Sequence, residues 1–242
     1  MSSTANQENS EDYVKRVGIE YRFGCYEEKR ADSCHLLGEY KEAVEKNIPE
    51  ALKLFKRNCE VDKYAPSCFK YGRYLLSSKH CEKDWDKAAS CLEVACDAKI
   101  PPACQRLGLV LWNGTPKKPP NPAAAARRME QACELDDPES CWLLSTWHLG
   151  PAAAVKNVNV KGQKGDKSTD STARAHLPRN MDLALKYGTK ACDMGSPHSC
   201  ANVSRMYRNG DGVPKDVQKA EEFKQRAIDL VKMMNEASPF TA

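Results

Sequence analysis

The chain has 242 residues, with 37 Lys or Arg and 33 Asp or Glu, so its formal net charge is only +4. This small excess does not indicate the concentrated basic face that nucleic-acid binding requires, and no nucleic-acid partner is expected. No segment approaches the roughly 18 consecutive apolar residues of a membrane-spanning helix, so the chain is not predicted to span a membrane.

The N-terminal segment is polar, and residues 1–10 are predicted to be a disordered tail. The stretch from Met1 to Asp12 has neither the basic and apolar regions of a secretory signal nor the Arg-rich pattern of a matrix presequence. A helix is predicted over about 11–28, with Cys25 close to its end.

From residue 33 onward the sequence predicts five pairs of helices, A and B, each followed by a turn. Helix A has an apolar and then a small residue three and four places after a cysteine, as in Leu37-Gly38. Helix B has a small residue eight places before a cysteine, as Ala51 stands before Cys59, so both lie on one face. The pairs are predicted at about 33–62, 67–98, 102–135, 139–194 and 198–234. Helix A is expected at about 33–45, 67–78, 102–113, 139–149 and 198–209, and helix B at about 49–62, 84–98, 122–135, 180–194 and 215–234.

The fourth pair contains an insertion of about 22 residues within 151–179, which is basic and rich in Gly, Ser and Thr. It is predicted to be a flexible, solvated loop, with contact to an anionic lipid or an acidic partner as the alternative. Gly114, Gly150 and Gly210 are predicted to end helices A in a left-handed conformation. Residues 235–242 are predicted to be a disordered C-terminal tail.

Ten of the twelve cysteines form a regular lattice of five pairs. The pairs are Cys25/Cys34, Cys59/Cys68, Cys96/Cys104, Cys133/Cys141 and Cys192/Cys200. The first cysteines of the pairs recur at intervals of 34, 37, 37 and 59 residues, and 34–37 is the period of a helix–turn–helix repeat. Each pair is therefore predicted to be a disulfide that joins helix B of one repeat to helix A of the next. The last helix B has Ile228 at the cysteine position, and no helix A follows it.

Regular cysteine pairs indicate an oxidising compartment, yet no cleavable signal is visible. The mitochondrial intermembrane space reconciles the two observations, because cysteine oxidation itself traps imported chains there. The alternatives are a reduced cytosolic protein and a secreted chain whose signal has been removed.

Cys81 and Cys91 lie outside the lattice. Cys91 is predicted to be a core residue of a helix B, and Cys81, beside His80, is predicted to be more exposed. The pair could be free, could form a sixth bridge, or could serve as a redox or copper-binding thiol pair. No C-x-x-C or H-x-x-x-H cluster completes a zinc site, so no metal site is predicted, and Cys81 and His80 are the remaining metal candidates.

The segment from Ser67 to Lys70 has the form S-x-x-K, which is part of the β-lactamase and penicillin-binding signature. The S-D-N and K-T-G elements that complete such a site are absent from the sequence. No catalytic residue is therefore predicted, and a coincidental match on a repeat helix is preferred to catalysis.

Four aromatic side chains are candidates for the concave partner-binding face of a helical repeat array. They are Tyr74, Trp112, Trp142 and Trp147. Ordinary amphipathic helix packing is the alternative explanation for them.

Residues 209–216, Asn-Gly-Asp-Gly-Val-Pro-Lys-Asp, match the connector of the Sel-one-like repeat, a relative of the TPR unit, as does Leu-Gly in helix A. With cysteines in place of the usual alanines, residues 11–234 resemble the cytochrome c oxidase assembly factor 7 family of the intermembrane space. The 151–179 insertion departs from that family. Bacterial secreted repeat proteins described as penicillin-binding share the seven-residue cysteine spacing but should begin with a signal peptide.

The resemblance implies an all-α, right-handed α-solenoid of five Sel-like or TPR-like helix pairs plus an N-terminal helix, over residues 11–234. It implies a non-enzymatic, monomeric scaffold that helps to assemble cytochrome c oxidase in the intermembrane space. Its partners would be assembly intermediates and the oxidative import machinery. No cofactor is required, and non-covalent handling of haem or copper is left open. The alternatives are a β-lactamase, a thiol-redox enzyme and a generic cytosolic adaptor.

Overall fold

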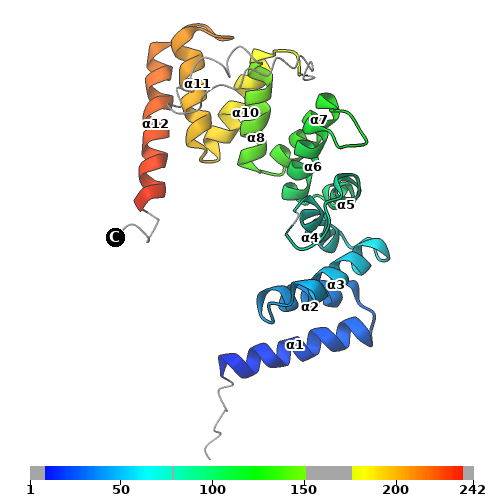
Figure 1. Ribbon diagram of the computed structural model, residues 1–242. Helices are drawn as coiled ribbons and strands as arrows, with labels where there is room; N and C mark the ends of the chain where they lie inside the picture. Colours follow the sequence, from blue (N-terminus) through cyan, green and yellow to red (C-terminus); the bar gives the residue numbers. More distant parts are fainter. Residues whose placement is uncertain (1–8, 78, 151–175, 237–242) are drawn as a thin grey trace, which may run out of the picture. The chain divides into compact units, whose positions relative to one another are not determined.

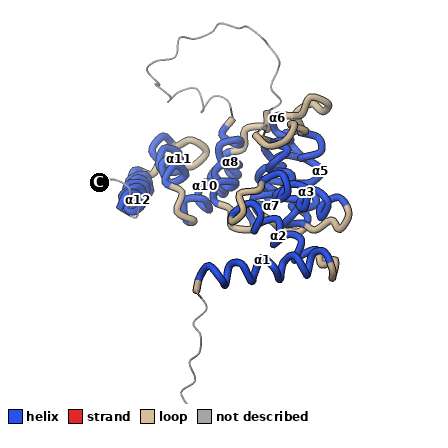
Figure 2. Tube along the Cα trace, turned by 60° about the horizontal axis from the view of Figure 1, so that its bottom comes forward, coloured by secondary structure: helices blue, strands red, loops and turns tan. Residues whose placement is uncertain are grey.

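The structure, a computed structural model, describes residues 9–77, 79–150 and 176–236, and within these ranges every regular element is an α-helix (Figures 1 and 2). The helices are α1 (Ser10–Tyr26), α2 (Ala31–Ala43), α3 (Ile48–Glu60), α4 (Ala65–Leu76), α5 (Trp85–Asp97), α6 (Pro101–Asn113), α7 (Pro122–Glu134), α8 (Pro138–Leu149), α10 (Met181–Asp193), α11 (Pro197–Asn209) and α12 (Val217–Glu236). The predicted fold of five helix pairs after an N-terminal helix is confirmed.

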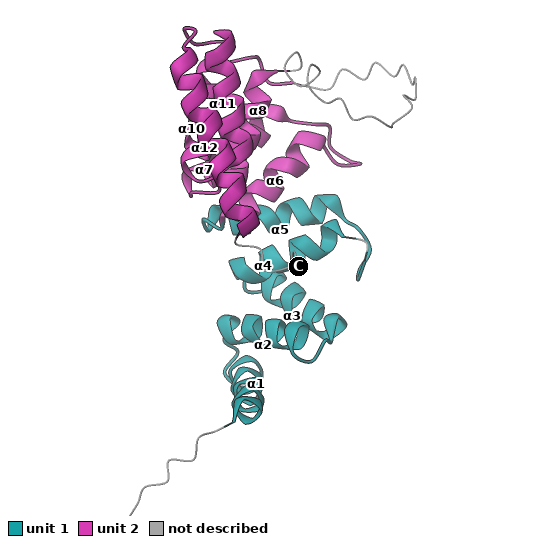
Figure 3. Ribbon diagram, turned by 90° about the vertical axis from the view of Figure 1, so that its left-hand side faces the viewer, with its two compact units in different colours: residues 1–100 teal, residues 101–242 magenta. Residues whose placement is uncertain are grey.

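The chain forms two compact units, residues 1–100 and residues 101–242 (Figure 3). The first contains α1 to α5, and the second contains α6 to α12. Within each unit every helix packs against the next one along the chain. The predicted tails lie almost wholly outside the described residues, as does nearly all of the 151–179 insertion.

Each helix B begins at a short polar residue that satisfies its first free backbone N–H groups. Asn47, Asp84, Asn121 and Asn180 accept a hydrogen bond from the amide three residues further on. Such a cap stabilises a helix by about 1 kcal/mol. The capping residues therefore fix where each helix B starts and hence which of its faces meets helix A.

Close packing of A against B explains the small residue in the repeat pattern. A Cβ atom added to Gly38 of α2 would lie 2.5 Å from the Phe55 ring, so only glycine fits there. The fourth pair reverses the arrangement, with Gly188 on α10 facing Ser145 of α8. The Ser145 hydroxyl donates to the carbonyl of Ala184 at 2.7 Å, which ties the two helices together.

The turn from each helix B to the next helix A contains one residue with positive φ. In unit 1 the turn residues Lys29 and Lys63 have φ of 59° and 51°, and in unit 2 Asp136 and Gly195 have 61° and 89°. Lys29, Lys63 and Asp136 are not glycine, so three of these four turns carry no glycine that would mark them in the sequence. The turn lets helix A double back, so that the cysteines on either side of it come within bonding distance.

The glycines predicted at the ends of helices A do have positive φ. The angles are 75° at Gly114, 73° at Gly150 and 69° at Gly210. Gly210 is left-handed as predicted, but Gly150 has ψ of 173° and belongs to a more extended region. Gly150 still caps α8, with its N–H donating to the carbonyl of Trp147 at 3.4 Å, but the chain leaves the helix in an extended conformation.

None of the helices in the described ranges is both long enough and apolar enough to cross a membrane.

Candidate functional site

Within the two units, four of the predicted cysteine pairs are disulfide bonds between consecutive helices. The Cα–Cα distances are 4.4 Å for Cys25–Cys34, 4.6 Å for Cys59–Cys68, 4.8 Å for Cys133–Cys141 and 4.7 Å for Cys192–Cys200. Cys96 and Cys104 are also disulfide-bonded. All ten side chains are buried, at most 3% exposed. The bridges therefore lie inside the repeat interfaces and are not placed to exchange with external thiols.

Cys81 and Cys91 are both free thiols. Cys91 is buried on α5, and burial raises the pKa of its thiol to about 11. Cys81 is half-buried, its Sγ lies 3.3 Å from the carbonyl oxygen of Tyr74, and burial raises its pKa as well. A redox-active cysteine needs a lowered pKa, because the thiolate is the reactive form. Neither thiol has the environment of a redox centre.

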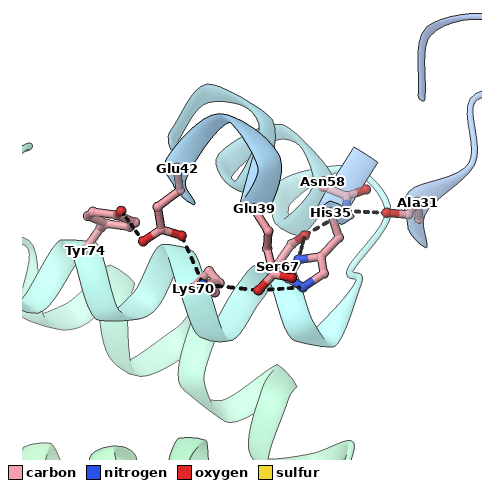
Figure 4. Close-up of polar contacts among 8 residues, drawn as sticks. All are labelled: Ala31, His35, Glu39, Glu42, Asn58, Ser67, Lys70 and Tyr74. Carbon is pink, nitrogen blue, oxygen red and sulfur yellow. Dashed lines mark hydrogen bonds and ion pairs between the residues drawn. The ribbon is translucent and has the colours of Figure 1, made fainter. Parts of the chain in front are cut away.

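A buried polar cluster joins α2, α3 and α4 in unit 1 (Figure 4). Ser67 on α4 is fully buried, and its Oγ accepts a hydrogen bond from Asn58 Nδ2 at 2.7 Å. Asn58 also donates to the carbonyl of Ala31 at 2.8 Å, which fixes the orientation of its amide. The Ser67 hydroxyl proton is thus left for His35 Nδ1, 3.0 Å away. Three helices from two repeats are linked through one hydroxyl.

A second group in the cluster is built on Lys70, one helical turn after Ser67. Its ammonium group lies 3.2 Å from Glu39 and 3.0 Å from Glu42, both on α2. The Tyr74 hydroxyl donates to Glu42 at 2.7 Å (Figure 4). Burial alone would raise the pKa of Glu42, but the hydrogen bonds from Tyr74 and Lys70 outweigh it and lower the pKa. Glu42 is therefore an ionised partner for Lys70 at neutral pH.

The cluster contains a serine, a histidine and a carboxylate, the residue types of a hydrolase triad. Four features oppose that chemistry. Ser67 is 0% exposed, so no substrate can reach its hydroxyl. Its oxygen already accepts a hydrogen bond from Asn58, and Glu39 lies 3.8 Å from His35 Nε2, too far for an orienting hydrogen bond. Lys70 donates to two carboxylates and is not a free base. The arrangement supports a structural joint between repeats.

The sequence pattern did not predict the partners of Ser67, since His35 and Asn58 come from other helices. One signal was available. A serine stands directly before the second cysteine of most pairs, at Ser33, Ser67, Ser140 and Ser199. A small polar residue at one fixed position of the repeat indicates a position between helices, where its hydroxyl meets the neighbouring repeat.

A small pocket of about 160 Å³ opens beside the cluster in unit 1. Lys70, Arg73, Tyr74 and His80 contribute to its lining. His80 is exposed and lies edge-on to the Tyr74 ring, 5.9 Å between centroids. Across the described residues, no group of three or more His, Cys, Asp or Glu side chains is placed to hold a metal ion. His80 and Cys81 are therefore not accompanied by a third side chain of these types that could complete a metal site.

The three tryptophans among the aromatic candidates lie in unit 2 and are half-buried. Trp112 of α6 and Trp147 of α8 stack on each other, with ring centroids 3.9 Å apart and an interplanar angle of 8°. Trp142 lies 6.2 Å from the His198 ring of α11. Each tryptophan thus contacts a neighbouring helix, so packing accounts for part of its surface.

The repeated helix pairs and the junctions between them are those of a helical-repeat protein. The Sel1 repeat family matches residues 31–60, 65–99, 101–137, 174–196 and 197–230, and the chain is a Sel1 repeat protein. Two solved structures share the fold. A protective antigen of uropathogenic Escherichia coli has a TM-score of 0.69 at 18% identity over 89% of this chain and 40% of its own. A Sel1 repeat protein from Oxalobacter formigenes has a TM-score of 0.61 at 19% identity over 90% of this chain and 55% of its own.

Within this class, the most informative relatives match nearly full length. Cytochrome c oxidase assembly factor 7A of Xenopus laevis is 34% identical over 97% of this chain and 94% of its own length. Cytochrome c oxidase assembly factor 7 of Danio rerio is 36% identical over 93% and 91%, and that of Homo sapiens 35% over 94% and 91%. The chain belongs to the cytochrome c oxidase assembly factor 7 family.

Proposed function

We propose that this protein helps to assemble cytochrome c oxidase in the mitochondrial intermembrane space, by binding proteins and without catalysing a reaction. The observation that carries the proposal is the relationship to named assembly factors over more than nine-tenths of the chain. Those relatives are named as assembly factors of cytochrome c oxidase, and we extend this role to the present chain.

The disulfide lattice supports the compartment part of the proposal. Disulfides persist where the surroundings are oxidising and are rare in reducing cytosol. Four bridges of one design, each at a repeat junction, are expected of a chain that folds under oxidation. The oxidative import machinery of that compartment would be the first partner of the reduced chain.

The polar cluster supports the non-catalytic part. Ser67 and Lys70 match the S-x-x-K motif of a catalytic site. However, Ser67 is hydrogen-bonded to Asn58 of α3, and Lys70 forms ion pairs with two glutamates of α2. Partner binding through exposed edges of Tyr74, Trp112, Trp142 and Trp147 stays a prediction, as does a monomeric state. Handling of haem or copper likewise stays a prediction, and no group of three or more His, Cys, Asp or Glu side chains in the described residues supports a bound metal ion.

The test is rescue of oxidase assembly in cells that lack the protein. We expect such cells to contain less assembled cytochrome c oxidase on native gels, and the wild-type chain to restore it. A Lys70→Ala variant should restore it equally, because no step of a binding role needs that amine as a base. Circular dichroism must first show that the variant is folded. A folded variant that fails to rescue, together with β-lactam turnover by the purified wild-type protein, would indicate an enzyme.

A further inference from the structure

The last helix, α12, lies beside α11 at the C-terminal end of unit 2 (Figure 1). A pocket of about 460 Å³ lies between these two helices, and its lining includes Ala201 of α11 and Ala227, Ile228 and Val231 of α12. Ile228 and Val231 are 49% and 47% exposed. Large aliphatic side chains exposed together around a pocket indicate a surface that a partner covers.

The same positions are buried in the inner repeats. Counted from the buried alanine near the start of each helix B, Ala227 and Ile228 of α12 correspond to Ala191 and Cys192 of α10. Ala191 and Cys192 are 0% exposed, because α11 covers them. The equivalent pairs Asn58/Cys59 of α3 and Ala132/Cys133 of α7 are at most 3% exposed. The face that α12 leaves open is therefore the face that receives the next helix A elsewhere.

The helix A side of the pocket leads to the same conclusion. Ala201 is the residue directly after the second cysteine of its pair, and its counterparts His35, Gln105 and Trp142 each reach the start of the next helix A. His35 contacts Ser67 at 3.0 Å, and Gln105 donates to Glu139 at 2.9 Å. Trp142 lies against His198. Among the described residues no helix follows α12, and Ala201 lines the pocket.

We propose that this pocket is a docking site for an amphipathic helix of a partner protein, which binds where the next helix A would lie. The inner helices that fill this position define the chemistry of the occupant. Two small residues face helix B and an aliphatic residue follows three places later, as in Ser140, Cys141 and Leu144. The inference rests on the proposed protein-binding function and gives it a surface.

Ile228 determines that a helix docked in this pocket cannot be joined to α12 by a disulfide at this position. It stands at the position of the first cysteine in every other pair, so a helix docked there gains an apolar contact in place of a disulfide. Association through this pocket is therefore non-covalent and reversible, as an assembly factor that must release its client requires. The inner junctions, which are permanent, carry the disulfide.

The first test uses a fluorescent peptide with the sequence of residues 197–209 and Cys200→Ala, which reproduces a helix A without its thiol. We expect the full chain to bind it saturably in an anisotropy titration. Val231→Glu, which places a charge in the pocket, should weaken the affinity at least tenfold. Met233→Glu is the matched control, because Met233 is 55% exposed on the same helix but does not line the pocket. It should stay within twofold of wild type.

The second test fixes the geometry by disulfide trapping in a Cys81→Ser background. Ile228→Cys should cross-link to the peptide that retains Cys200 at least ten times faster than Met233→Cys. Equal rates, or no peptide binding, would overturn the proposal. Self-association that Val231→Glu abolishes would assign the pocket to a second copy, and binding only after removal of residues 237–242 would assign it to the tail; either result also overturns it. Failed binding with normal oxidase rescue would refute this docking site alone, whereas intact binding with failed rescue would refute the proposed function alone.

Discussion

A serine stands before the second cysteine of most pairs, and the surroundings of Ser67 in unit 1 differ from those of Ser140 and Ser199 in unit 2. In unit 1 the Ser67 hydroxyl bonds to Asn58 and His35. In unit 2 the hydroxyls of Ser140 and Ser199 are equally buried, but neither has a hydrogen-bond partner among the described residues. The residue before the first cysteine is Asn58 at the Ser67 junction and an alanine, Ala132 or Ala191, at the two junctions of unit 2.

This difference distinguishes the features shared by all junctions within the units from a feature found at only one of them. A small side chain and a disulfide occur at each junction within the units, so they make the common interface. The polar cluster around Ser67 is a local addition that replaces apolar contact by hydrogen bonds. A buried hydroxyl without a partner carries a desolvation penalty of about 1–3 kcal/mol, so the two arrangements should respond oppositely to loss of the hydroxyl.

Removing a disulfide should have the largest effect, and a similar one in both units. We expect Cys59→Ser with Cys68→Ser, and Cys192→Ser with Cys200→Ser, each to lower the free energy of unfolding by about 2–3 kcal/mol, since the closed loops are of similar length. Urea unfolding followed by circular dichroism measures this. An unchanged midpoint in either variant would show that its bridge does not stabilise the junction.

Removing the serine hydroxyl should distinguish the units. Ser67→Ala should lower the free energy of unfolding by about 1–3 kcal/mol, because the Asn58 amide and the His35 ring nitrogen each lose a partner inside the protein. Ser140→Ala is the matched control, and it should be neutral or slightly stabilising. If urea unfolding showed equal losses of unfolding free energy in the two variants, the hydroxyl would have the same role at both junctions.

Much of this comparison could be predicted from the sequence. The cysteine period and the Leu-Gly and Ala positions gave the helix pairs, because each is a local signal repeated at one place per repeat. The contacts of Ser67 could not be predicted. His35 lies 32 residues before Ser67, and whether their side chains meet depends on how one repeat is rotated against the next. The positive φ of Lys63 and Asp136 was missed for another reason, since neither residue type marks a left-handed turn as glycine does.

The pH dependence of stability should follow the buried histidines. Burial lowers the pKa of His35 in unit 1 and of His148 in unit 2. The unfolded chain then binds more protons than the folded chain as the pH falls below about 6.5, so the free energy of unfolding decreases between about pH 7 and pH 5. His35→Gln and His148→Gln should each flatten this decrease. An unaltered slope in both variants, measured by urea unfolding at several pH values, would contradict the assignment.

The smallest effect is expected at the turns between repeats. Lys63 adopts a left-handed conformation that disfavours residues with a Cβ by about 1–2 kcal/mol, whereas glycine carries an entropic penalty of about 0.5–1 kcal/mol. Lys63→Gly should therefore raise the free energy of unfolding by about 0.5 kcal/mol. Gly195→Lys, the reverse change at the equivalent turn of unit 2, should lower it by a similar amount. Thermal unfolding resolves both, and a destabilised Lys63→Gly would show that Lys63 makes compensating contacts.

The central claim is that disulfides at the repeat junctions hold the helix pairs of this protein together. Alkylation of the freshly purified native protein, followed by non-reducing peptide mapping, tests it most directly. We expect five bridges, with Cys96 joined to Cys104, and two unbridged thiols. Cys81 should react in the native state and Cys91 only after unfolding. Ten or more thiols alkylated without reduction would show that the disulfides at the repeat junctions are absent. The same result would contradict the proposed oxidising compartment.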